Sequence, residues 1–538
     1  MEEVMKILVS DDVSEKGVEL LRQNGYTVDV ETNLDEDQLA ERIGEYDGLI
    51  TRSMTHVTAK VIEKAKKLKI VGRAGVGIDS IDLKAATARG IIVVNAPTSN
   101  TIAATEHTCA MILAVTRHIP QAHDSLMSGE WNREKFTGIQ LKDKTMGIIG
   151  VGRIGSRIAK RMQAMEMRTI GYDPYIPEER GKQLNCELVD LDTLLRESDY
   201  ITLHTPLTKE TRGMIGAEEI AKMKDGVRVI NVSRGAVLDI NALAEALKSG
   251  KVAGAAVDVF PEEPLTSDIN PFKGMDNVVI TPHLGASTVE AQEGVSLDVA
   301  RSIMAGLKGE PVPTAVNMAP IAPGVYSTIR PYFDLMERMG IMGVYLAEAP
   351  MKEITVEYSC KLAETETALL TTAVLKGALN PILQDAVNFV NAPDLAKQRH
   401  ISVKEVKTSD HGNFVDAVTV RIVTAKGEHK VVGSLFNQTE AKIVQIDEYR
   451  VDFKPENYLL LAPHIDQPNM IGQIATVLGE AKINITGMQV GNMTQKGTNI
   501  MAVAVEDDIP NDVMVKLRSI NGILDMKLIH CEPNQQEA

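Results

Sequence analysis

The sequence predicts an α/β protein with two doubly wound parallel-sheet domains, followed by an α+β domain and a ferredoxin-like C-terminal domain. Short apolar runs alternate with helix-length segments over most of the first 310 residues, as in parallel sheets covered on both faces. A glycine-rich turn at 150–155 begins the second series of strands. From residue 458 the order becomes strand, helix, strand, strand, helix, strand. The length of 538 residues allows about three or four domains.

The individual elements of both parallel sheets can be placed from this alternation. In the first series we expect strands at 6–10, 26–30, 48–51, 69–72 and 91–95, and helices at 15–24, 35–43 and 59–65. A long buried helix is predicted at 101–117. In the second series we expect strands at 146–149, 168–173, 200–204, 228–232, 254–259 and 277–281, with helices at 157–167 and 287–309.

Three glycines mark the turn between a strand and a helix. Gly150, Gly152 and Gly155 form a G-x-G-x-x-G. The first glycine permits the tight turn, the second lets the backbone approach a pyrophosphate, and the third lets helix and strand pack closely. Asp173 follows the next strand, where its carboxylate can accept hydrogen bonds from ribose hydroxyls and would repel a 2′-phosphate. This Rossmann-like pattern predicts NAD rather than NADP as the cofactor.

Composition and charge exclude several classes of protein. The hydrophobic content of 44% and charged content of 24% are typical of globular domains, and the net charge of −16 argues against a nucleic-acid or acidic-membrane surface. No signal peptide and no membrane span are expected, because the chain begins Met-Glu-Glu-Val and has no run of eighteen apolar residues. Four scattered cysteines indicate buried thiols in the cytoplasm. Glu106 and His107 do not form H-E-x-x-H, so no metal site is expected.

Three polar motifs each follow a predicted strand of the second sheet, where ligands of such sheets bind. They begin at Asn231 (NVSRG), Asp258 (DVFPEEP) and Thr281 (TPHLGAS). With the glycine turn, these motifs closely resemble those of the D-isomer-specific 2-hydroxyacid dehydrogenases, over roughly residues 5–317. The resemblance implies a dehydrogenase that transfers a hydride to NAD.

The resemblance also implies a role for each polar side chain. His283 is expected to be the acid/base, Glu263 its orienting carboxylate, and Arg234 the cation that holds the substrate carboxylate. Glu262 is the alternative to Glu263, which is preferred because it precedes Pro264. The cofactor-binding residues implied are Val76, Gly150, Gly152, Arg153, Ile154, Gly155, Asp173, Thr205, Ser233, Asp258 and Gly285. The other histidines, His107, His118 and His204, are expected to be hydrogen-bonded structural residues.

Within that family, four further segments are similar to the D-3-phosphoglycerate dehydrogenases of the long form. They contain Thr51-Arg-Ser, Gly72-Arg-Ala-Gly-Val-Gly, Asn95-Ala-Pro-Thr-Ser-Asn and Trp131-Asn-Arg-Glu-Lys. The similarity implies that the substrate, 3-phosphoglycerate, is bound by Arg52, Ser53, Gly75, Asn100 and Arg133. Arg133 and Lys135 would supply positive charge for its phosphate, from the same subunit or from a neighbouring one. A solvated surface position is the alternative for each of these basic residues.

The C-terminal region resembles an ACT regulatory domain, on the residues Ala462-Pro-His-Ile-Asp466 and Ile483-Asn-Ile-Thr-Gly. The resemblance implies an effector, L-serine, that is bound by His464 and Asp466 of one chain and by Asn484 of its partner. The usual Pro-Gly of the turn is replaced by Pro468-Asn469, and asparagine tolerates the left-handed backbone that the turn needs. A domain used only for oligomerisation is the alternative. We expect strands at 459–462, 483–490, 498–505 and 523–528, and helices at 470–481 and 510–519.

The region between these parts is less clearly patterned. Five prolines between 308 and 331 predict a linker. Helices are expected near 362–375 and 382–390, and strands at 417–424 and 430–436, in a region that matches the intervening domain of the long-form enzymes. Its motifs at Leu375, Asn388 and Gly433 are read as anion contacts or as ordinary turns.

Together these observations predict four domains and one reaction. The domains are 1–98 with 287–318 (substrate), 99–286 (NAD), 319–453 (intervening) and 457–530 (ACT). The expected reaction is the NAD-dependent oxidation of 3-phosphoglycerate to 3-phosphooxypyruvate, the first step of serine synthesis, in a homo-oligomer that is a dimer or a tetramer. The alternatives are a reductase of hydroxypyruvate or another 2-hydroxy acid, and an NAD-sensing corepressor on the same scaffold.

Overall fold

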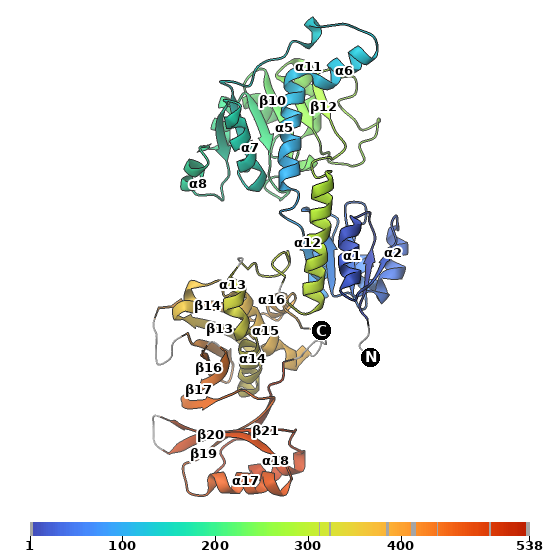
Figure 1. Cartoon of the computed structure of the whole chain (residues 1–538). Helices are drawn as coiled ribbons and strands as arrows, with labels where there is room; N and C mark the ends of the chain where they lie inside the picture. The colour runs from blue at the N-terminus through green and yellow to red at the C-terminus, as the bar shows by residue number, and fades with distance from the viewer. Residues whose placement is uncertain are drawn as a thin grey trace.

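The computed structural model describes residues 4–310, 312–321, 324–383, 387–409, 416–437, 439–493 and 497–533. Within these ranges the strands form three sheets, and the helices cover them (Figure 1). Two sheets are parallel and the third is mixed. The predicted fold class, α/β with an α+β C-terminal part, is confirmed.

The first sheet has the strand order β2-β1-β3-β4-β5, with all neighbours parallel. Its strands are β1 (Lys6–Val9), β2 (Thr27–Val30), β3 (Gly48–Thr51), β4 (Ile70–Arg73) and β5 (Ile92–Asn95). Helices α1 (Glu15–Gln23) and α12 (Val289–Leu307) cover one face, and α2 (Glu36–Arg42), α3 (Ala59–Lys64) and α4 (Leu83–Ala88) cover the other. Because both faces are covered, β3 and most of the other strands read as continuous apolar runs.

The second sheet is parallel, in the order β12-β11-β10-β9-β6-β7-β8. Its strands are β6 (Thr145–Ile149), β7 (Arg168–Tyr172), β8 (Glu187–Leu188), β9 (Tyr200–Leu203), β10 (Val227–Asn231), β11 (Val252–Val257) and β12 (Val278–Ile280). One core lies beneath α5 (Thr101–Arg117) and α7 (Arg153–Ala164), and the other beneath α9 (Leu191–Glu197), α10 (Ala217–Lys222) and α11 (Ile240–Ser249). Helices α6 (Ile119–Met127) and α8 (Glu178–Gln183) complete this part. The order reverses between β6 and β9, where doubly wound sheets bind dinucleotides.

Most expected elements of these two sheets agree with the structure to within two residues, and the 101–117 helix agrees in full. One expected boundary was wrong. The helix predicted at 157–167 begins at Arg153 and ends at Ala164, because the glycine turn is completed at Gly152 and the next residues already take helical geometry. Gly155 therefore lies inside the first turn of α7.

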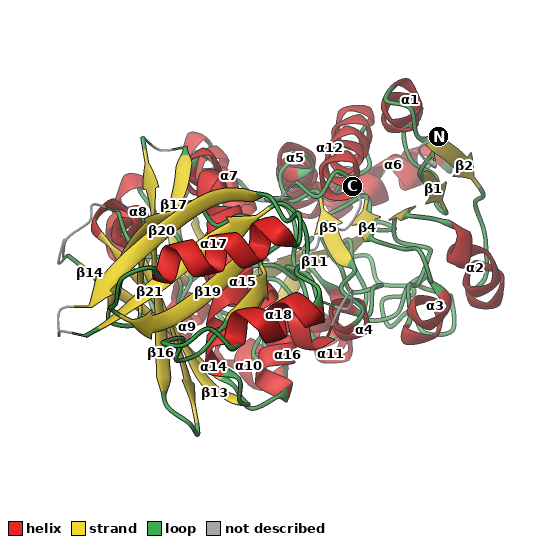
Figure 2. Cartoon of the chain, turned by 90° about the horizontal axis from the view of Figure 1, so that it is seen from below, coloured by secondary structure: helices red, strands yellow, loops and turns green. Residues whose placement is uncertain are grey.

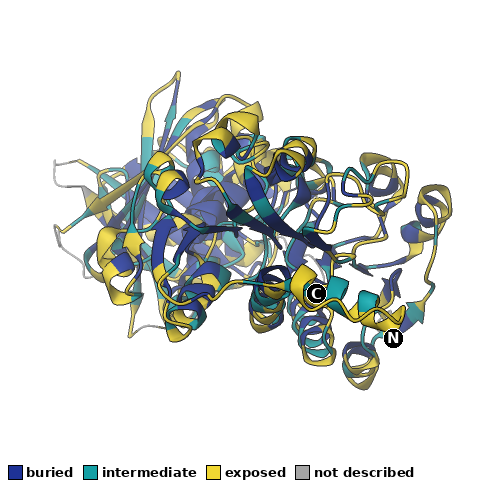
Figure 3. Cartoon of the chain, turned by 90° about the horizontal axis from the view of Figure 1, so that it is seen from above, coloured by how far each residue is buried: buried dark blue, intermediate teal, exposed yellow. Residues whose placement is uncertain are grey.

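The third sheet has ten strands, in the order β14-β13-β15-β16-β17-β18-β20-β21-β19-β22. They are β13 (Met351–Ser359), β14 (Ser402–Thr408), β15 (Val418–Thr424), β16 (Glu428–Phe436), β17 (Glu440–Ile446), β18 (Tyr449–Phe453), β19 (Tyr458–Ile465), β20 (Ile485–Met493), β21 (Thr498–Val505) and β22 (Lys527–His530). The helices are α13 (Val325–Ile329), α14 (Phe333–Ala347), α15 (Ala368–Leu383), α16 (Ala392–Gln398), α17 (Met470–Glu480) and α18 (Asn511–Arg518). Buried segments are concentrated in the strands, and exposed ones in outer helix faces and loops (Figure 3).

The last four strands, β20-β21-β19-β22, confirm the ferredoxin-like prediction. Helices α17 and α18 lie side by side across one face of these strands (Figure 2). Asn469 has a φ of 71°, so it adopts the left-handed conformation expected at the turn before α17. The other face of these strands packs into the core of the preceding region, where Leu459 and Ile529 join Leu335 of α14. The expected intervening and ACT domains thus share one sheet, through β18 and β20, and one core.

The region between 325 and 450 was the least well predicted. The helix expected near 362–375 is α15, which runs from Ala368 to Leu383. Of the helix expected at 382–390, residues 384–386 lie outside the described residues, and 387–390 form a loop and turn rather than a helix. Here Asn388 and Asn391 exchange side-chain and backbone hydrogen bonds, which stabilise the turn in place of a helix. Residues 312–317 of the expected linker lie along β5, where Val316 N donates to Val93 O.

Candidate active site

The predicted site residues follow strands of both parallel sheets, and α12, which packs on the first sheet, begins shortly after His283 (Figure 1). From the second sheet, Arg234 follows β10, Asp258 follows β11, and His283 follows β12. From the first sheet, Arg52 follows β3 and Gly75 follows β4. The topology therefore gathers the predicted residues at the strand ends, the position at which open α/β sheets bind ligands.

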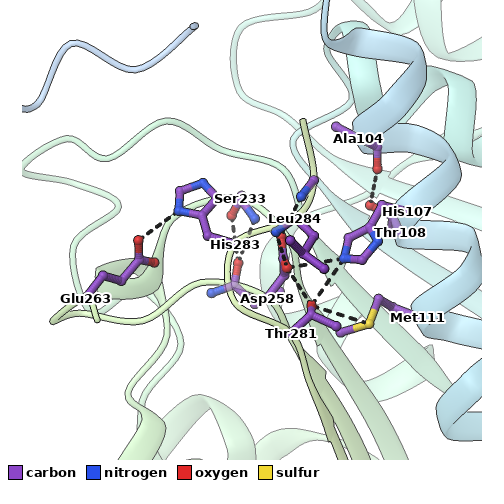
Figure 4. A network of polar contacts seen from close by, with 12 residues as sticks. Ala104, His107, Thr108, Met111, Ser233, Asp258, Glu263, Thr281, His283 and Leu284 are labelled. Carbon is purple, nitrogen blue, oxygen red and sulfur yellow. Dashed lines mark hydrogen bonds and ion pairs between the residues drawn. The ribbon is translucent and has the colours of Figure 1, made fainter. Parts of the chain in front are cut away.

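His283 and Glu263 form the expected pair (Figure 4). Nδ1 of His283 lies 2.8 Å from Oε2 of Glu263. The other oxygen, Oε1, accepts a hydrogen bond from the backbone N–H of Phe260 at 2.9 Å, which fixes the carboxylate. Because a carboxylate only accepts, Nδ1 carries the proton and Nε2 is left with a lone pair. Burial raises the pKa of Glu263, but the bonds from His283 and Phe260 outweigh burial and lower it below its ordinary value.

Asp258 is fully buried, and its carboxylate accepts four hydrogen bonds, from side chains and backbone (Figure 4). Its Oδ1 accepts from Leu284 N at 2.8 Å and from the hydroxyl of Thr281, and its Oδ2 accepts from Gly285 N at 2.9 Å. Nε2 of His107 is 3.2 Å from the same Oδ1. The prediction of a hydrogen-bonded His107 is thus confirmed, although its partner, Asp258, was not predicted.

The glycine turn has the geometry that a bound pyrophosphate requires. Gly150 has a φ of 89°, and a Cβ there would lie 2.6 Å from His204 O. A Cβ at Gly155 would lie 2.1 Å from Gly150 O, so helix and strand meet at these two positions without room for a side chain. A Cβ at Gly152 would face open space, where the first N–H groups of α7 are available to an anion.

The neighbouring polar groups also fit a dinucleotide. Asp173 Oδ2 accepts from Val151 N at 3.0 Å, which anchors the carboxylate and leaves acceptor capacity for ribose hydroxyls. Thr205 Oγ1 is buried without a hydrogen-bond partner among the described residues. Arg153 donates to Pro97 O at 3.1 Å, while Ile154 packs against the core, so the backbone of these two residues is what faces the turn. The residues present therefore fit NAD.

Arg234 reaches from the second sheet to the first. Its Nε is 3.3 Å from Asp79 Oδ2, and its Nη1 donates to Ser233 O at 2.8 Å. A Cβ at Gly77 would lie 2.3 Å from Arg234 Nη2, so the absence of a side chain at Gly77 leaves room for the guanidinium. Ser233 is held by Asn231, whose Oδ1 accepts from both its N–H and its hydroxyl. Arg234 therefore pairs with Asp79 rather than with the His283 pair.

Arg73, at the end of β4, is a residue that the sequence reasoning missed. Burial lowers its pKa to about 10, with further lowering by repulsion from Arg234 and Arg52. Its Nε is buried without a partner among the described residues. Arg73 is thus close enough to Arg234 and to Arg52 to be repelled by both, and such a group of cations is suited to bind an anion. The motif at 72–77 was recognised, but a single arginine at a strand end gave no separate signal.

The remaining substrate residues of the first sheet lie at the same edge. Arg52 N–H donates to Asp11, and Arg52 and Ser53 line a small hollow of about 200 Å³. The side chain of Arg73 passes over Gly75, where a Cβ would overlap the guanidinium. Val76 O accepts from Asn95 Nδ2 at 2.6 Å, and Asn100 precedes α5, its side chain making no cap to that helix.

Arg133 does not join this group within one chain. It lies in the exposed segment between α6 and β6. Lys135 pairs at 3.2 Å with Asp276, which precedes β12, whereas His283 follows β12. Lys135 and His283 are therefore at opposite ends of β12.

Within one chain, Asn484 lies at the opposite end of β21 from His464 and Asp466, as expected if it acts from the partner chain. His464 is buried, and its Nδ1–H donates to Ala462 O at 2.9 Å. Asp466 is exposed after β19, and Asn484 donates to Glu506 at 3.0 Å before β20. The expected effector roles remain predictions.

The described residues include no cluster of histidine, cysteine and carboxylate side chains that could hold a metal ion. Nor does any of their helices combine the length and apolar character that crossing a membrane requires. No disulfide joins any of Cys109, Cys186, Cys360 and Cys531, all of which lie within the described residues.

Comparison with known proteins identifies the family. Residues 109–285 match the D-isomer specific 2-hydroxyacid dehydrogenase, NAD binding domain, and residues 328–447 match the D-3-phosphoglycerate dehydrogenase intervening domain. A D-3-phosphoglycerate dehydrogenase of Archaeoglobus fulgidus is 43% identical over 97% of this chain and 99% of its own. One of Bacillus subtilis is 38% identical over 98% of this chain and 99% of its own.

Solved structures support the same relationship. D-lactate dehydrogenase from Aquifex aeolicus, complexed with NAD and lactic acid, has a TM-score of 0.52 at 30% identity and covers 57% of this chain and 96% of its own. The TT0316 protein from Thermus thermophilus has a TM-score of 0.54 at 34% identity, over 58% of this chain and 100% of its own. The chain therefore belongs to the D-3-phosphoglycerate dehydrogenases, NAD-dependent members of the D-isomer-specific 2-hydroxyacid dehydrogenase family.

Proposed function

We propose that this enzyme oxidises 3-phospho-D-glycerate to 3-phosphooxypyruvate, the first step of L-serine synthesis. The observation that carries the proposal is the arrangement of one imidazole–carboxylate pair, His283 and Glu263, and three arginines at the strand ends of two facing sheets. The substrate has a carboxylate and a phosphate, and three guanidinium groups match that charge better than they match an uncharged alcohol.

The residues of the chain would act on the substrate as follows. Nε2 of His283 accepts the proton of the C2 hydroxyl, because its Nδ1 already donates to Glu263. Glu263 stabilises the imidazolium that forms. Arg234 leaves its contact with Asp79 and binds the substrate carboxylate instead. Arg73 and Arg52 attract the negative charge of the substrate phosphate. NAD, when bound, accepts the hydride from C2.

The cofactor would lie along the second sheet. The backbone of residues 152–155 would hold the pyrophosphate, and Asp173 would hold the ribose. The nicotinamide end would lie next to His283, held by Thr205, Ser233, Asp258 and Gly285. We assign 99–286 as the NAD domain, and 1–98 with 287–318 as the substrate domain. Closure of the two would exclude water from the reacting carbon.

The direct test is the rate of NADH formation, at 340 nm, with 3-phospho-D-glycerate, D-glycerate and D-lactate, each with and without L-serine. The proposal expects 3-phospho-D-glycerate to have the highest kcat/KM. Similar rates with D-glycerate would favour a general 2-hydroxyacid dehydrogenase, and binding of NAD without turnover would favour the corepressor. Inhibition by L-serine that Asp466→Ala removes would support the effector site at the ACT-like unit.

Replacing Glu263 by glutamine should lower kcat by about 10² and remove the contribution of this carboxylate to the acid side of the pH profile. The carboxylate acts while it is ionised, so its contribution is present above its pKa and is lost as the pH falls through that pKa. Because the pKa is lowered, the wild-type enzyme keeps this contribution to a more acidic pH than an ordinary glutamate would allow. Stopped-flow rates between pH 4 and pH 9 measure the effect.

Glu262 is the matched control for Glu263. It is adjacent in sequence and exposed, and the carboxylate that contacts His283 is that of Glu263. Glu262→Gln should leave kcat and the pH profile unchanged. Equal losses in the two variants would contradict the assignment of Glu263.

We also propose that a second copy of the chain covers α6 and the segment that follows it. None of the residues of α6 is buried, and Leu126, Met127 and Trp131 are 56%, 74% and 78% exposed. So many large exposed apolar side chains in one segment mark an interface. A dimer formed here could bring Arg133 of one subunit to the site of the other, and pairing of the C-terminal units would extend the dimer to a tetramer.

The oligomer proposal predicts that Leu126→Asp combined with Trp131→Ser lowers the oligomeric state, as measured by size-exclusion chromatography with light scattering. If Arg133 crosses to the partner, the same variant loses affinity for 3-phospho-D-glycerate while its affinity for NADH stays unchanged. Tyr175→Ser, which changes an 88% exposed aromatic residue elsewhere on the second-sheet domain, is the control. An unchanged mass for the double variant would contradict the interface.

A further inference from the structure

His107 on α5 is an imidazole that the proposed mechanism does not use, although it contacts the centre of the site (Figure 4). Its Nε2 is 3.2 Å from Asp258 Oδ1 and 3.2 Å from Thr281 Oγ1. The His107 side chain is 19% exposed and that of Asp258 is fully buried, so this contact is shielded from water. A hydrogen bond to a charged group is stronger in such surroundings than at a surface.

Asp258 in turn holds the backbone that carries His283. Its carboxylate accepts from Leu284 N and Gly285 N, and its carbonyl accepts from His283 N at 2.8 Å. His283 has a φ of 55°, a conformation that is unfavourable for a residue other than glycine and persists only where its surroundings impose it. The hydrogen bonds to Asp258 therefore determine the position of the His283 imidazole.

The protonation states in this network follow from its partners. An ionised carboxylate only accepts, so Nε2 of His107 carries the proton. Burial raises the pKa of Asp258, but the bonds from His107, Thr281 and Leu284 outweigh burial and lower it below its ordinary value. Its other titratable neighbours are Glu263, on the loop after β11, and His283, on the loop after β12.

We infer that His107 is a positioning residue, which keeps the carboxylate of Asp258 ionised and oriented so that the turn carrying His283 stays in its reactive conformation. Because α5 also connects the two parallel-sheet regions and packs on β11, this bond ties the connecting helix to the site. The inference rests on the proposed dehydrogenase activity and adds a role for a residue outside the substrate and cofactor contacts.

The test compares His107→Leu, His107→Gln and Met111→Leu. Leucine removes the donor, glutamine keeps an N–H donor at a similar distance, and Met111 lies one turn further along α5, where its sulfur contacts Thr281 rather than Asp258. We expect His107→Leu to lower kcat about tenfold with little change in KM. The acid limb of its pH profile should move to higher pH, because Asp258 without this donor is protonated more easily. His107→Gln should restore both properties, and Met111→Leu should behave as the wild type.

Two results would overturn the inference: an unchanged pH profile in His107→Leu, or an equal loss in the leucine and glutamine variants. If circular dichroism shows that the leucine variant does not fold, His107→Asn replaces it. The shorter asparagine side chain moves the N–H donor away from Asp258, so the acid limb of this variant's pH profile must also move to higher pH. Turnover of the unaltered enzyme and fluorescence titration with NADH are measured in the same series. A failure of the proposed function would appear in the wild type, and a failure of this inference only in the variants.

Discussion

Replacing His283 by alanine is expected to lower kcat by about 10³ while the affinity for NADH stays within about twofold of the wild type. The alanine variant has no base at the C2 hydroxyl, and the turn at 283–285 keeps its bonds to Asp258 because these involve backbone N–H groups. NADH affinity by fluorescence titration and single-turnover rates of NADH formation together separate a lost base from a lost cofactor site.

The control for this variant is His56→Ala. His56 is exposed in the loop after β3, and its removal should change neither the NADH affinity nor the single-turnover rate. A loss of less than about tenfold in His283→Ala would show that another group removes the proton, because general-base catalysis contributes 10² or more. Equal weakening of NADH binding and turnover would instead indicate a structural role for the imidazole.

Replacing Arg234 by glutamine is expected to lower kcat/KM for 3-phospho-D-glycerate by about 10², most of it through KM. The guanidinium can donate two parallel hydrogen bonds to a carboxylate, and glutamine provides neither the charge nor the fork. Arg234→Lys keeps the charge but loses the fork, so it should recover only part of the loss. Steady-state kinetics over a wide range of substrate concentration measures both variants.

Replacing Asp79, the partner of Arg234, should have the opposite effect on KM. Asp79→Asn removes the carboxylate that pairs with Arg234 at 3.3 Å, so the guanidinium becomes more available to a substrate. We expect an unchanged or lower KM in this variant, in contrast to the large rise in Arg234→Gln. A KM that rises equally in both would mean that the Arg234–Asp79 pair serves to hold the two sheets together rather than to bind substrate.

Those parts of the site that depend on local sequence could be predicted. The glycine turn requires glycine at defined positions for steric reasons, and polar residues directly after buried strands converge because parallel strands end at the same edge. The pairing of His283 with Glu263, twenty residues apart, came from the resemblance to the 2-hydroxyacid dehydrogenases, and the structure gives 2.8 Å between the two side chains.

The parts that depend on contacts between distant segments could not be predicted. His107 reaches Asp258 across 151 positions, and no pattern around either residue marks the other. Arg73 is distinguished only by the two arginines beside it, which come from other strands. The sharing of one sheet by the intervening and C-terminal regions depends on two residue pairs between β18 and β20, and such pairing leaves no local trace in the sequence. The edge strand β14 was missed because its two valines lie three residues apart, without the alternation of a half-buried strand, and most of its residues are exposed.

The most direct measurement of the central claim is the fate of deuterium placed at C2 of 3-phospho-D-glycerate. If His283, Glu263 and the arginines hold this substrate beside the nicotinamide, one deuterium is recovered in the NADH formed, and the single-turnover rate shows a primary isotope effect. Recovery of the label in water, or NADH formed without it, would contradict the account.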